Sequence, residues 1–341
     1  MRIRGFITHK CAEDYSDCQD RFRINSITKI VAVSDGISQS IFSAEWAELL
    51  SFYYADNGHC DENDRLWLCS EWRSAVDAKI HERKSQGGKT RTAERMLGNH
   101  KGAGATLCGV KFLNAYSWEG HVLGDSCIIT VSKIGSQYQL DFFSSAEKEF
   151  DNCPDYYDSF PEKRGRGTFK EFSGEINRNC SMFLVSDPLA KFLKENLDKS
   201  TLYTEELLRL NNHEDFCRLV SNWRELGMDD DDTTLCIVEW DGSDLFQIIH
   251  EDDIERFVEN DLILGGRDNI DTMPLGVDNV IPMPPNDSSI LMNENDRSCA
   301  VHSLTGKKNN HRCDLIKIVC RLMHNIKKRI VRDVNYHANR K

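Results

Sequence analysis

The stretch Ile30-Val31-Ala32-Val33-Ser34-Asp35-Gly36 sets an apolar run directly before an acidic residue and a glycine. β-Branched residues fit a buried strand, and Asp-Gly is typical of a turn that ends one. The same order recurs in Met182-Phe183-Leu184-Val185-Ser186-Asp187. Both stretches therefore predict a strand that ends at a carboxylate.

Further acidic residues stand where strands are expected to begin. Asp231 and Asp232 precede the apolar run 234–240, and Asp20 precedes the short run 21–24. Because the end of one antiparallel strand lies beside the start of the next, these carboxylates are expected to meet on one rim of a sheet. Clustered carboxylates raise each other's pKa, and Mg²⁺ or Mn²⁺ relieves the repulsion. The pattern predicts a metal site on the edge of a β-sandwich.

The amino-acid composition argues against several classes of protein. The 341 residues are 40% apolar and carry a net charge of −12, which argues against general nucleic-acid binding. Thirteen cysteines include no Cys-x-x-Cys pair, so we expect reduced thiols rather than a zinc knuckle. The charged N-terminus does not resemble a signal peptide, and no apolar run approaches the length of about 18 residues that spans a membrane. These features predict a cytoplasmic protein without a transmembrane segment.

Apolar periodicity predicts the elements of the first 245 residues. A helix is expected over 43–52, capped by Ser43 and packed through Trp46, Ala47 and Leu50. A second helix is expected over 65–82, with Leu66, Trp72, Val76 and Ile80 buried. Strands are expected at 2–9, 106–112, 116–123, 127–133 and 138–143, and a turn at Gly124-Asp125-Ser126.

Three other segments complete this part of the chain. The Gly-rich stretch 84–104 is interpreted as a mobile loop, because Arg83 stands where a phosphate-binding P-loop needs its first glycine. Residues 144–180 are polar and irregular. After Asp187 two helices are expected, the second with a buried stripe of Phe216, Leu219, Val220, Trp223 and Leu226. Strands and helices that come in groups favour an α+β fold with antiparallel sheets.

The composition changes near residue 245 and divides the chain. Residues 1–245 form the predicted catalytic domain, and residues 246–312, rich in Asn, Asp, Pro and Ser, are expected to be a linker or partly disordered segment. Residues 313–335 have the pattern of a basic amphipathic helix. This helix is expected to bind a partner or a membrane surface, or to pack back on its own domain.

Six short motifs, in order, resemble those of the protein phosphatase 2C family of metal-dependent Ser/Thr phosphatases. They are Gln19-Asp20, Val33-Ser34-Asp35-Gly36, Gly102-Ala103-Gly104-Ala105-Thr106, Leu123-Gly124-Asp125-Ser126, Leu184-Val185-Ser186-Asp187 and Asp231-Asp232-Thr233-Thr234-Leu235. Each motif alone is common, but their order and their place beside expected strands are specific. The resemblance covers about residues 1–240, and Ser34 to Ser38 with Glu45-Trp46-Ala47 resembles a bacterial branch of the family.

The resemblance implies a fold, a reaction and a set of ligands. The fold would be a four-layer α-β-β-α sandwich with two antiparallel central sheets. The reaction would be hydrolysis of phosphoserine and phosphothreonine by water activated by two Mn²⁺ or Mg²⁺ ions. Asp35 would bridge both ions, the Gly36 carbonyl would complete one of them, Asp187 and Asp231 would bind the second, and Asp125 would join Asp187 at a third. Asp20 would orient the water. A phosphoprotein is the implied substrate, and a cognate Ser/Thr kinase is a plausible partner.

The chain also departs from the family pattern. Ile37 stands where many members carry a histidine, and Pro188 replaces the glycine that follows the fifth motif. No arginine occurs at positions 11–19 to grip phosphate, so Lys10 is the nearest candidate. Two other functions stay open: a pseudophosphatase or regulatory binding module of the same fold, and a hydrolase of small phosphate esters.

Overall fold

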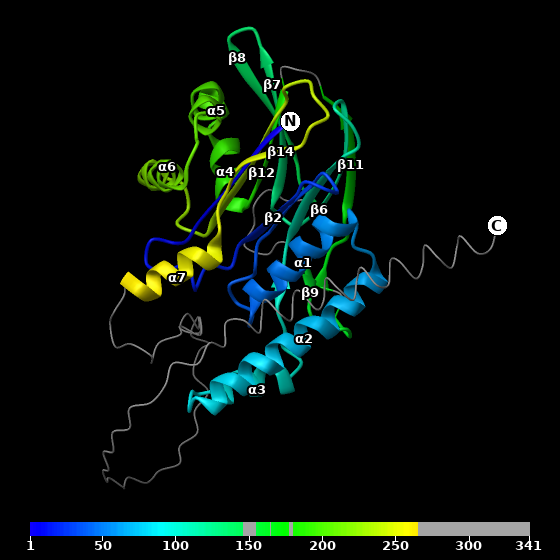
Figure 1. Cartoon of the computed structure of the whole chain (residues 1–341), viewed down its shortest axis with the longest axis vertical. Coiled ribbons are helices and arrows are strands. Elements are labelled where there is room, and N and C mark those ends of the chain that lie inside the picture. The colour runs from blue at the N-terminus through cyan, green and yellow to red at the C-terminus, as the bar shows by residue number, and fades with distance from the viewer. Residues whose placement is uncertain (146–154, 164, 177–179, 265–341) are drawn as a thin grey trace, which may run out of the picture. The chain divides into compact units, whose positions relative to one another are not determined.

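The computed structural model describes residues 1–145, 155–163, 165–176 and 180–264, with side chains up to Asp261. The expected helix at 313–335 and most of the expected linker lie outside the described residues. The chain folds as α+β, with helices packed against antiparallel sheets (Figure 1). No helix among the described residues is long and apolar enough to cross a membrane.

The larger sheet has six strands, all antiparallel except for one edge. Its order is β14 (Gln247–Glu251), β1 (Arg2–Thr8), β13 (Thr233–Glu239), β12 (Cys180–Val185), β7 (Cys127–Ile134) and β8 (Gln137–Phe143). Strand β14 pairs parallel with β1, where a linker was expected from residue 246. Residues 247–251 therefore belong to the sheet, and α7 (Ile254–Leu264) follows them directly.

The second sheet has five strands, all antiparallel. Its order is β11 (Lys170–Glu175), β6 (Ser117–Leu123), β5 (Leu107–Phe112), β3 (Ile30–Ser34) and β2 (Arg21–Asn25). A small third sheet joins β10 (Gly165–Arg166), β9 (Tyr156–Asp158) and β4 (Gly104–Ala105). The segment 144–180, expected to be irregular, thus contributes three short strands. Strands β10 and β11 are mostly exposed, so their sequences contain no run of apolar residues that would have predicted a strand.

Successive side chains along the central strands alternate between two hydrophobic cores, one on each face of their sheet. Val31 and Val33 pack between the two large sheets, whereas Ile30 and Ala32 face the opposite side, against Tyr54 and Ala55. In the same way Leu184 and Cys236 point between the sheets, and Phe183 and Ile237 point outward. Successive side chains of a strand face opposite sides, so fully apolar strands must be covered on both faces.

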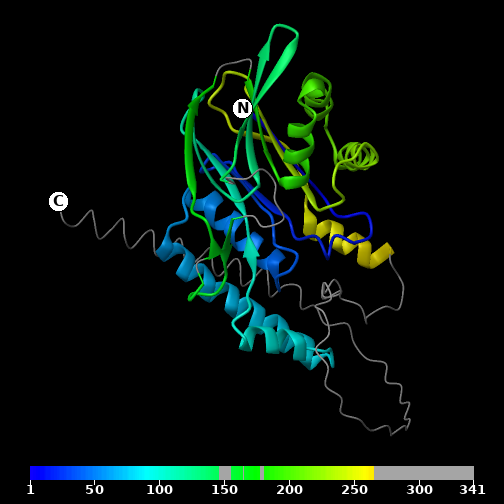
Figure 2. The same cartoon turned by 180° about the vertical axis from the view of Figure 1, so that it is seen from behind.

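Helices supply those covers (Figures 1 and 2). The outer face of the six-stranded sheet packs on α4 (Asp187–Glu195), α5 (Ser200–Leu208) and α6 (His213–Glu225), with the short η1 (Leu197–Lys199) between them. The outer face of the five-stranded sheet packs on α1 (Ser43–Asn57), beside which lie α2 (Glu62–Ser85) and α3 (Arg91–Gly98). The layers run helix, sheet, sheet, helix, in agreement with the expected order.

Several helix predictions are confirmed and several need correction. Trp46, Ala47 and Leu50 are buried as expected, but Phe42 in a left-handed conformation precedes α1, and Ser43 makes no cap. In α2, Leu66 is exposed and Arg65 is buried instead, where its guanidinium binds the carbonyls of Asp158, Phe160 and Lys163.

The remaining corrections concern the loops and the later helices. The stretch 84–104 is not all loop, because α3 occupies its centre and buries Ala93 and Leu97. Three helices, not two, begin after residue 186, and Leu226 of the expected stripe is exposed just after α6. The described cysteines are all free thiols, as expected.

Candidate active site

Strand register brings distant carboxylates to one end of the sheets. In the six-stranded sheet Val185 pairs with Leu235 and Thr8 pairs with Thr233, so the end of β12 and the start of β13 are neighbours. In the five-stranded sheet Arg21 pairs with Ser34, which places the start of β2 beside the end of β3. The residues that flank these positions are Asp187, Asp231, Asp232, Asp20 and Asp35.

Gly36 is required where it stands, because the chain has no room for a side chain there. A Cβ atom at this position would lie 2.9 Å from Ser43 Cβ and 3.0 Å from the Gln19 carbonyl oxygen. The glycine forms an isolated antiparallel bridge with Ala105, and the Thr106 N–H donates to the Asp35 carbonyl at 2.9 Å. These contacts hold Asp35 at the end of β3.

An open pocket of about 670 Å³ collects the predicted ligand positions. Asp35, Gly36, Asp125, Asp187 and Asp231 all line it. Asp125 is buried in the turn between β6 and β7, and Asp187 begins α4, with Pro188 in the first turn where proline needs no N–H partner. The same pocket carries four basic side chains, which are Lys101, Lys163, Arg166 and Lys191.

Electrostatics at the floor of the pocket is dominated by like charges. Burial raises the pKa of Asp35 well above its usual range, and Asp20, Asp187 and Asp125 raise it further. Burial likewise raises the pKa of Asp187, with repulsion from Asp125 and Asp231 added. The leading contributions to the pKa of Asp35 are burial and carboxylates, with no cation among them. A cation in this pocket would therefore be strongly favoured.

Asp20 lies behind the pocket rather than in its lining. Its side chain is fully buried, Oδ2 accepts a hydrogen bond from Thr234 Oγ1 at 2.8 Å, and Oδ1 has no hydrogen-bond partner among the described residues. Burial, followed by repulsion from Asp232, raises its pKa to about 7. Asp20 thus adds negative potential next to Asp35.

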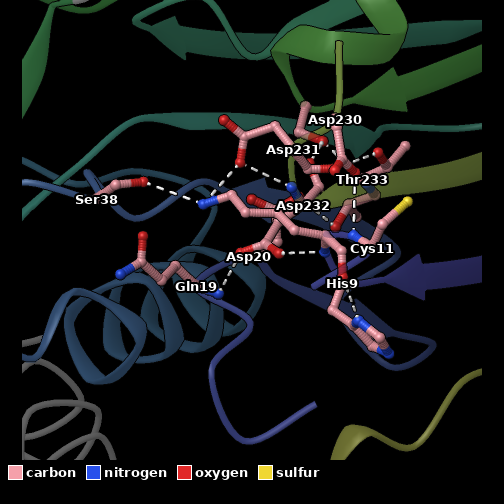
Figure 3. Close-up of polar contacts among 12 residues, drawn as sticks. His9, Cys11, Gln19, Asp20, Ser38, Asp230, Asp231, Asp232 and Thr233 are labelled. Carbon is pink, nitrogen blue, oxygen red and sulfur yellow. Dashed lines mark hydrogen bonds and ion pairs between the residues drawn. The ribbon is translucent and has the colours of Figure 1, made fainter. Parts of the chain in front are cut away.

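Asp232 fixes the loop that joins β1 to β2 (Figure 3). Its Oδ2 accepts the Gln19 N–H at 2.7 Å, and its Oδ1 accepts the Lys10 N–H at 3.2 Å. One buried carboxylate therefore ties both ends of the loop to the start of β13. The sequence placed Asp232 beside the site but gave it no role.

Lys10 contacts a carboxylate and lies outside the lining of the pocket. Its Nζ is 3.0 Å from Asp231 Oδ1 and 3.4 Å from Ser38 Oγ, near the contacts drawn in Figure 3. Burial alone would lower the pKa of Lys10, but Asp231 and Asp232 outweigh it and raise the pKa. In this structure the Lys10 ammonium group forms an ion pair with Asp231. A role of Lys10 in binding phosphate stays a prediction.

The predicted ligands share a pocket but do not close around one point. Among the described residues, no three His, Cys, Asp or Glu side chains are grouped so that they could hold a metal ion. The ion pair with Lys10 engages one of the Asp231 oxygens. A cation that binds Asp231 through Oδ1 would compete with the Lys10 ammonium group for this oxygen.

The basic side chains of the pocket were missed by the sequence reasoning. Lys101 comes from the stretch interpreted as a loop, and Lys163 and Arg166 come from the segment interpreted as irregular. Their signal was the clustering of Lys and Arg with Gly in both segments, which is a pattern of anion-binding loops.

Comparison with known proteins gives fold neighbours only. No protein-family model and no curated protein sequence matches the chain. A bacterial serine phosphatase is 13% identical with a TM-score of 0.45, and the match covers 71% of this chain and 98% of that one. The serine/threonine phosphatase Stp1 from Staphylococcus aureus is 14% identical with a TM-score of 0.45 and coverages of 70% and 94%. The Mycobacterium tuberculosis serine/threonine phosphatase PstP/Ppp is 14% identical with a TM-score of 0.42 and coverages of 70% and 97%. We therefore base the function on the chain's own residues.

Proposed function

We propose that the protein is a metal-dependent phosphatase that hydrolyses phosphoserine and phosphothreonine in proteins. The main support is that Asp35, Gly36, Asp125, Asp187 and Asp231 line one pocket together with four basic side chains. Acidic oxygens suit hard divalent cations, and the lysines and arginine suit the charge of a phosphate group. Few other functions call for both kinds of charge in one open pocket.

The donor set fits Mn²⁺ or Mg²⁺ in its chemistry. Burial raises the pKa of both Asp35 and Asp187, and repulsion from Asp20, Asp125 and Asp231 raises both further, which is the repulsion that a cation removes. Asp35 and the Gly36 carbonyl would hold one ion, Asp187 and Asp231 a second, and Asp125 with Asp187 a third. Such ions supply Lewis acidity to a phosphoryl group and to an attacking water.

The remaining residues of the pocket have supporting roles. Asp20 would keep water oriented at Asp35, because its buried carboxylate acts on Asp35 at short range. Lys101, Lys163, Arg166 and Lys191 would neutralise the phosphate and the acidic residues around it. An open pocket of about 670 Å³ admits a phosphorylated side chain with its neighbours. The partners would be cytoplasmic phosphoproteins and the kinase that modifies them.

The test is turnover of a phosphopeptide by the full chain with Mn²⁺, compared with Asp35→Asn. We expect Asp35→Asn to lose at least about 10³-fold in kcat, a loss of about 4 kcal/mol in transition-state stabilisation. Asp141→Asn, an exposed residue of β8, is the matched control and keeps full activity. Turnover that survives both EDTA and Asp35→Asn would refute the proposal.

Parallel assays with p-nitrophenyl phosphate and nucleoside monophosphates would separate a protein phosphatase from a hydrolase of small esters. We expect kcat/KM to be highest for the phosphopeptide, since a peptide fills more of the open pocket of about 670 Å³ than a small ester does. A clear preference for nucleotides would favour the small-ester function.

A binding module of the same fold is the second candidate. The observation that favours it is the pairing of Asp231 with Lys10, together with the absence of a closed three-residue ligand group among the described residues. Calorimetric titration with Mn²⁺ decides between the two. Micromolar binding that Asp35→Asn abolishes supports the enzyme, and no binding by the wild type supports the module.

A further inference from the structure

A second cluster of reactive groups lies on α6, away from the residues of the pocket. His213 and Cys217 are four residues apart on this helix and therefore share one face. Their neighbours come from β1, from the β1–β2 loop and from the end of β14, which are Thr8, Tyr15 and Asp252. We refer to Cys217, His213, Asp252 and Tyr15 as the thiol cluster.

The distances connect a thiol, an imidazole and a carboxylate in a chain. Cys217 Sγ is 3.3 Å from His213 Nε2, and His213 Nδ1 is 2.8 Å from Asp252 Oδ2. An imidazole that donates its Nδ1–H to a carboxylate presents Nε2 as the base, here toward the sulfur. The Tyr15 hydroxyl lies 2.8 Å from the same Nε2 and 3.7 Å from Sγ.

Asp252 is held in place by donors from three directions. Its side chain is only 1% exposed, and Oδ2 also accepts the Ile7 N–H at 2.9 Å. His250 Nε2 lies 2.8 Å from Oδ1, and the Asp252 N–H donates to the Gly5 carbonyl at 3.0 Å. A carboxylate held by this many donors fixes the orientation of His213.

The cluster favours a separated pair of charges. Burial would lower the pKa of His213, but hydrogen bonds to Asp252 and Cys217 outweigh it and raise the pKa to about 10. Burial would raise the pKa of Cys217, but His213 and Thr8 outweigh it and lower the pKa. The other polar and titratable groups that face the pair are Tyr15 from the loop and His250 from β14. None of them displaces His213 from the sulfur.

The cluster also holds the loop that carries Lys10 and Gln19. Tyr15 packs edge-on against His9 and lies 4.8 Å from the ring of Phe257, which stacks on His213 at 4.1 Å. Phe257 belongs to α7, which follows β14 (both yellow in Figure 1). Cys217 is partly exposed as a residue.

We propose that Cys217 is a redox modification site: a thiolate, paired with His213 and Asp252, that hydroperoxides oxidise to a sulfenic acid. The thiolate attacks one peroxide oxygen, so an S–O bond forms and the O–O bond breaks. The sulfur loses two electrons to the peroxide. The leaving hydroxide or alkoxide takes the proton from the His213 imidazolium and departs as water or alcohol, and Cys217 becomes a sulfenic acid. Oxidation removes the ion pair and loosens the β1–β2 loop.

The test measures the reaction of each cysteine of the full chain with iodoacetamide at pH 6.5, by mass spectrometry. We expect Cys217 to react about tenfold faster than the exposed Cys11, because a paired thiolate persists at a pH where an ordinary thiol is almost fully protonated. In urea-unfolded protein the two should react alike. A Cys217 that reacts no faster than Cys11 in the folded chain overturns the proposal.

Variants of the two histidines on Asp252 test the pairing. His213→Gln is expected to slow Cys217 at least fivefold, whereas His250→Gln, which alters the other histidine on the same carboxylate, leaves the rate within about twofold. Protection of the buried Cys108 and Cys236 from iodoacetamide reports whether each variant is folded. Equal slowing by both variants would contradict the assigned role of His213.

Peroxide treatment followed by a sulfenic-acid probe tests the product. We expect the label at Cys217 in the wild type and none there in His213→Gln. Hydrogen exchange of residues 9–19 should rise after oxidation of the wild type but not of Cys217→Ser. No label at Cys217, or unchanged exchange in the labelled protein, would refute the corresponding half of the proposal. Both readouts are independent of phosphatase activity.

Discussion

The pocket and the thiol cluster place half-buried and buried aspartates in opposite surroundings. In the pocket, Asp35 and Asp187 face other carboxylates, and burial and repulsion raise the pKa of both. In the thiol cluster, Asp252 faces two histidines and two backbone N–H or carbonyl partners. The carboxylates of the pocket repel one another unless a cation binds. Asp252 in the thiol cluster finds all its partners within the chain.

This difference in partners distinguishes a ligand-binding site from a network of side chains that supports a reactive group. Groups that bind a ligand are left short of partners by their own chain, and this costs stability that ligand binding returns. Groups that support a reactive side chain must be satisfied, since an unpaired buried charge would destabilise the fold. An Asp→Asn substitution is therefore expected to have opposite effects on the free energy of unfolding in the two places.

The largest expected effect is a change of sign between two Asp→Asn substitutions. Asp252→Asn should lower the free energy of unfolding by about 3 kcal/mol, because it breaks a buried and paired charge. Asp187→Asn should raise it by about 1 kcal/mol in metal-free buffer, because it relieves repulsion from Asp125 and Asp231. Urea denaturation with EDTA measures both.

The exposed Asp141→Asn serves as the reference and should change stability by less than about 0.5 kcal/mol. Added Mn²⁺ should reverse the order of Asp187→Asn and the wild type, since only the wild type gains ligand stabilisation. If Asp187→Asn destabilises the metal-free protein, the repulsive character of the pocket is refuted.

The strand-end aspartates show what the sequence could predict. Apolar runs such as 30–34 mark buried strands, and the antiparallel register then brings their flanking carboxylates to one end, as the pairs Val185–Leu235 and Arg21–Ser34 do. Local pattern and strand pairing point to the same result here. The four-layer order follows because such strands must be covered on both faces.

Other parts depended on contacts that no local pattern encodes. Strand β14 alternates between exposed and half-buried residues and joins β1 in parallel at the edge of the sheet, so no buried apolar run marked it in the sequence. The thiol cluster needs Asp252 from β14, Tyr15 from a loop and two residues from α6. The pairing of Lys10 with Asp231 likewise depends on β1 and β13 being neighbours.

A second prediction concerns the pH dependence of the thiol cluster. The raised pKa of His213, about 10, gives stability that is fully present below the pKa of about 6.5 expected in the unfolded chain and is lost as pH rises through about 10. The lowered pKa of Cys217 acts in the opposite direction below about pH 8.5. The two effects therefore oppose each other below about pH 8.5, and above it only the loss from His213 remains.

The wild type should therefore exceed His213→Gln in stability at pH 8.5 and lose about 1 kcal/mol of this advantage by pH 10.5, after allowance for partial exposure. Thermal or urea unfolding of both proteins across this range gives the difference. A difference that does not change with pH would show that His213 carries no extra proton in the folded state.

The smallest expected effect decides the role of Lys10. The ammonium group lies 3.0 Å from Asp231 Oδ1, so a cation that uses this oxygen competes with Lys10. A partly exposed ion pair contributes up to about 1 kcal/mol, and Lys10→Met should therefore tighten Mn²⁺ binding up to about fivefold while KM for a phosphopeptide changes less than twofold. Lys79→Met, which breaks a comparable pair with Glu45 outside this pocket, should leave Mn²⁺ affinity unchanged. If Lys10→Met instead raises KM for the phosphopeptide and leaves Mn²⁺ affinity unaltered, Lys10 binds the phosphate group. The ion pair with Asp231 would then belong to the substrate-free protein and would open when substrate binds.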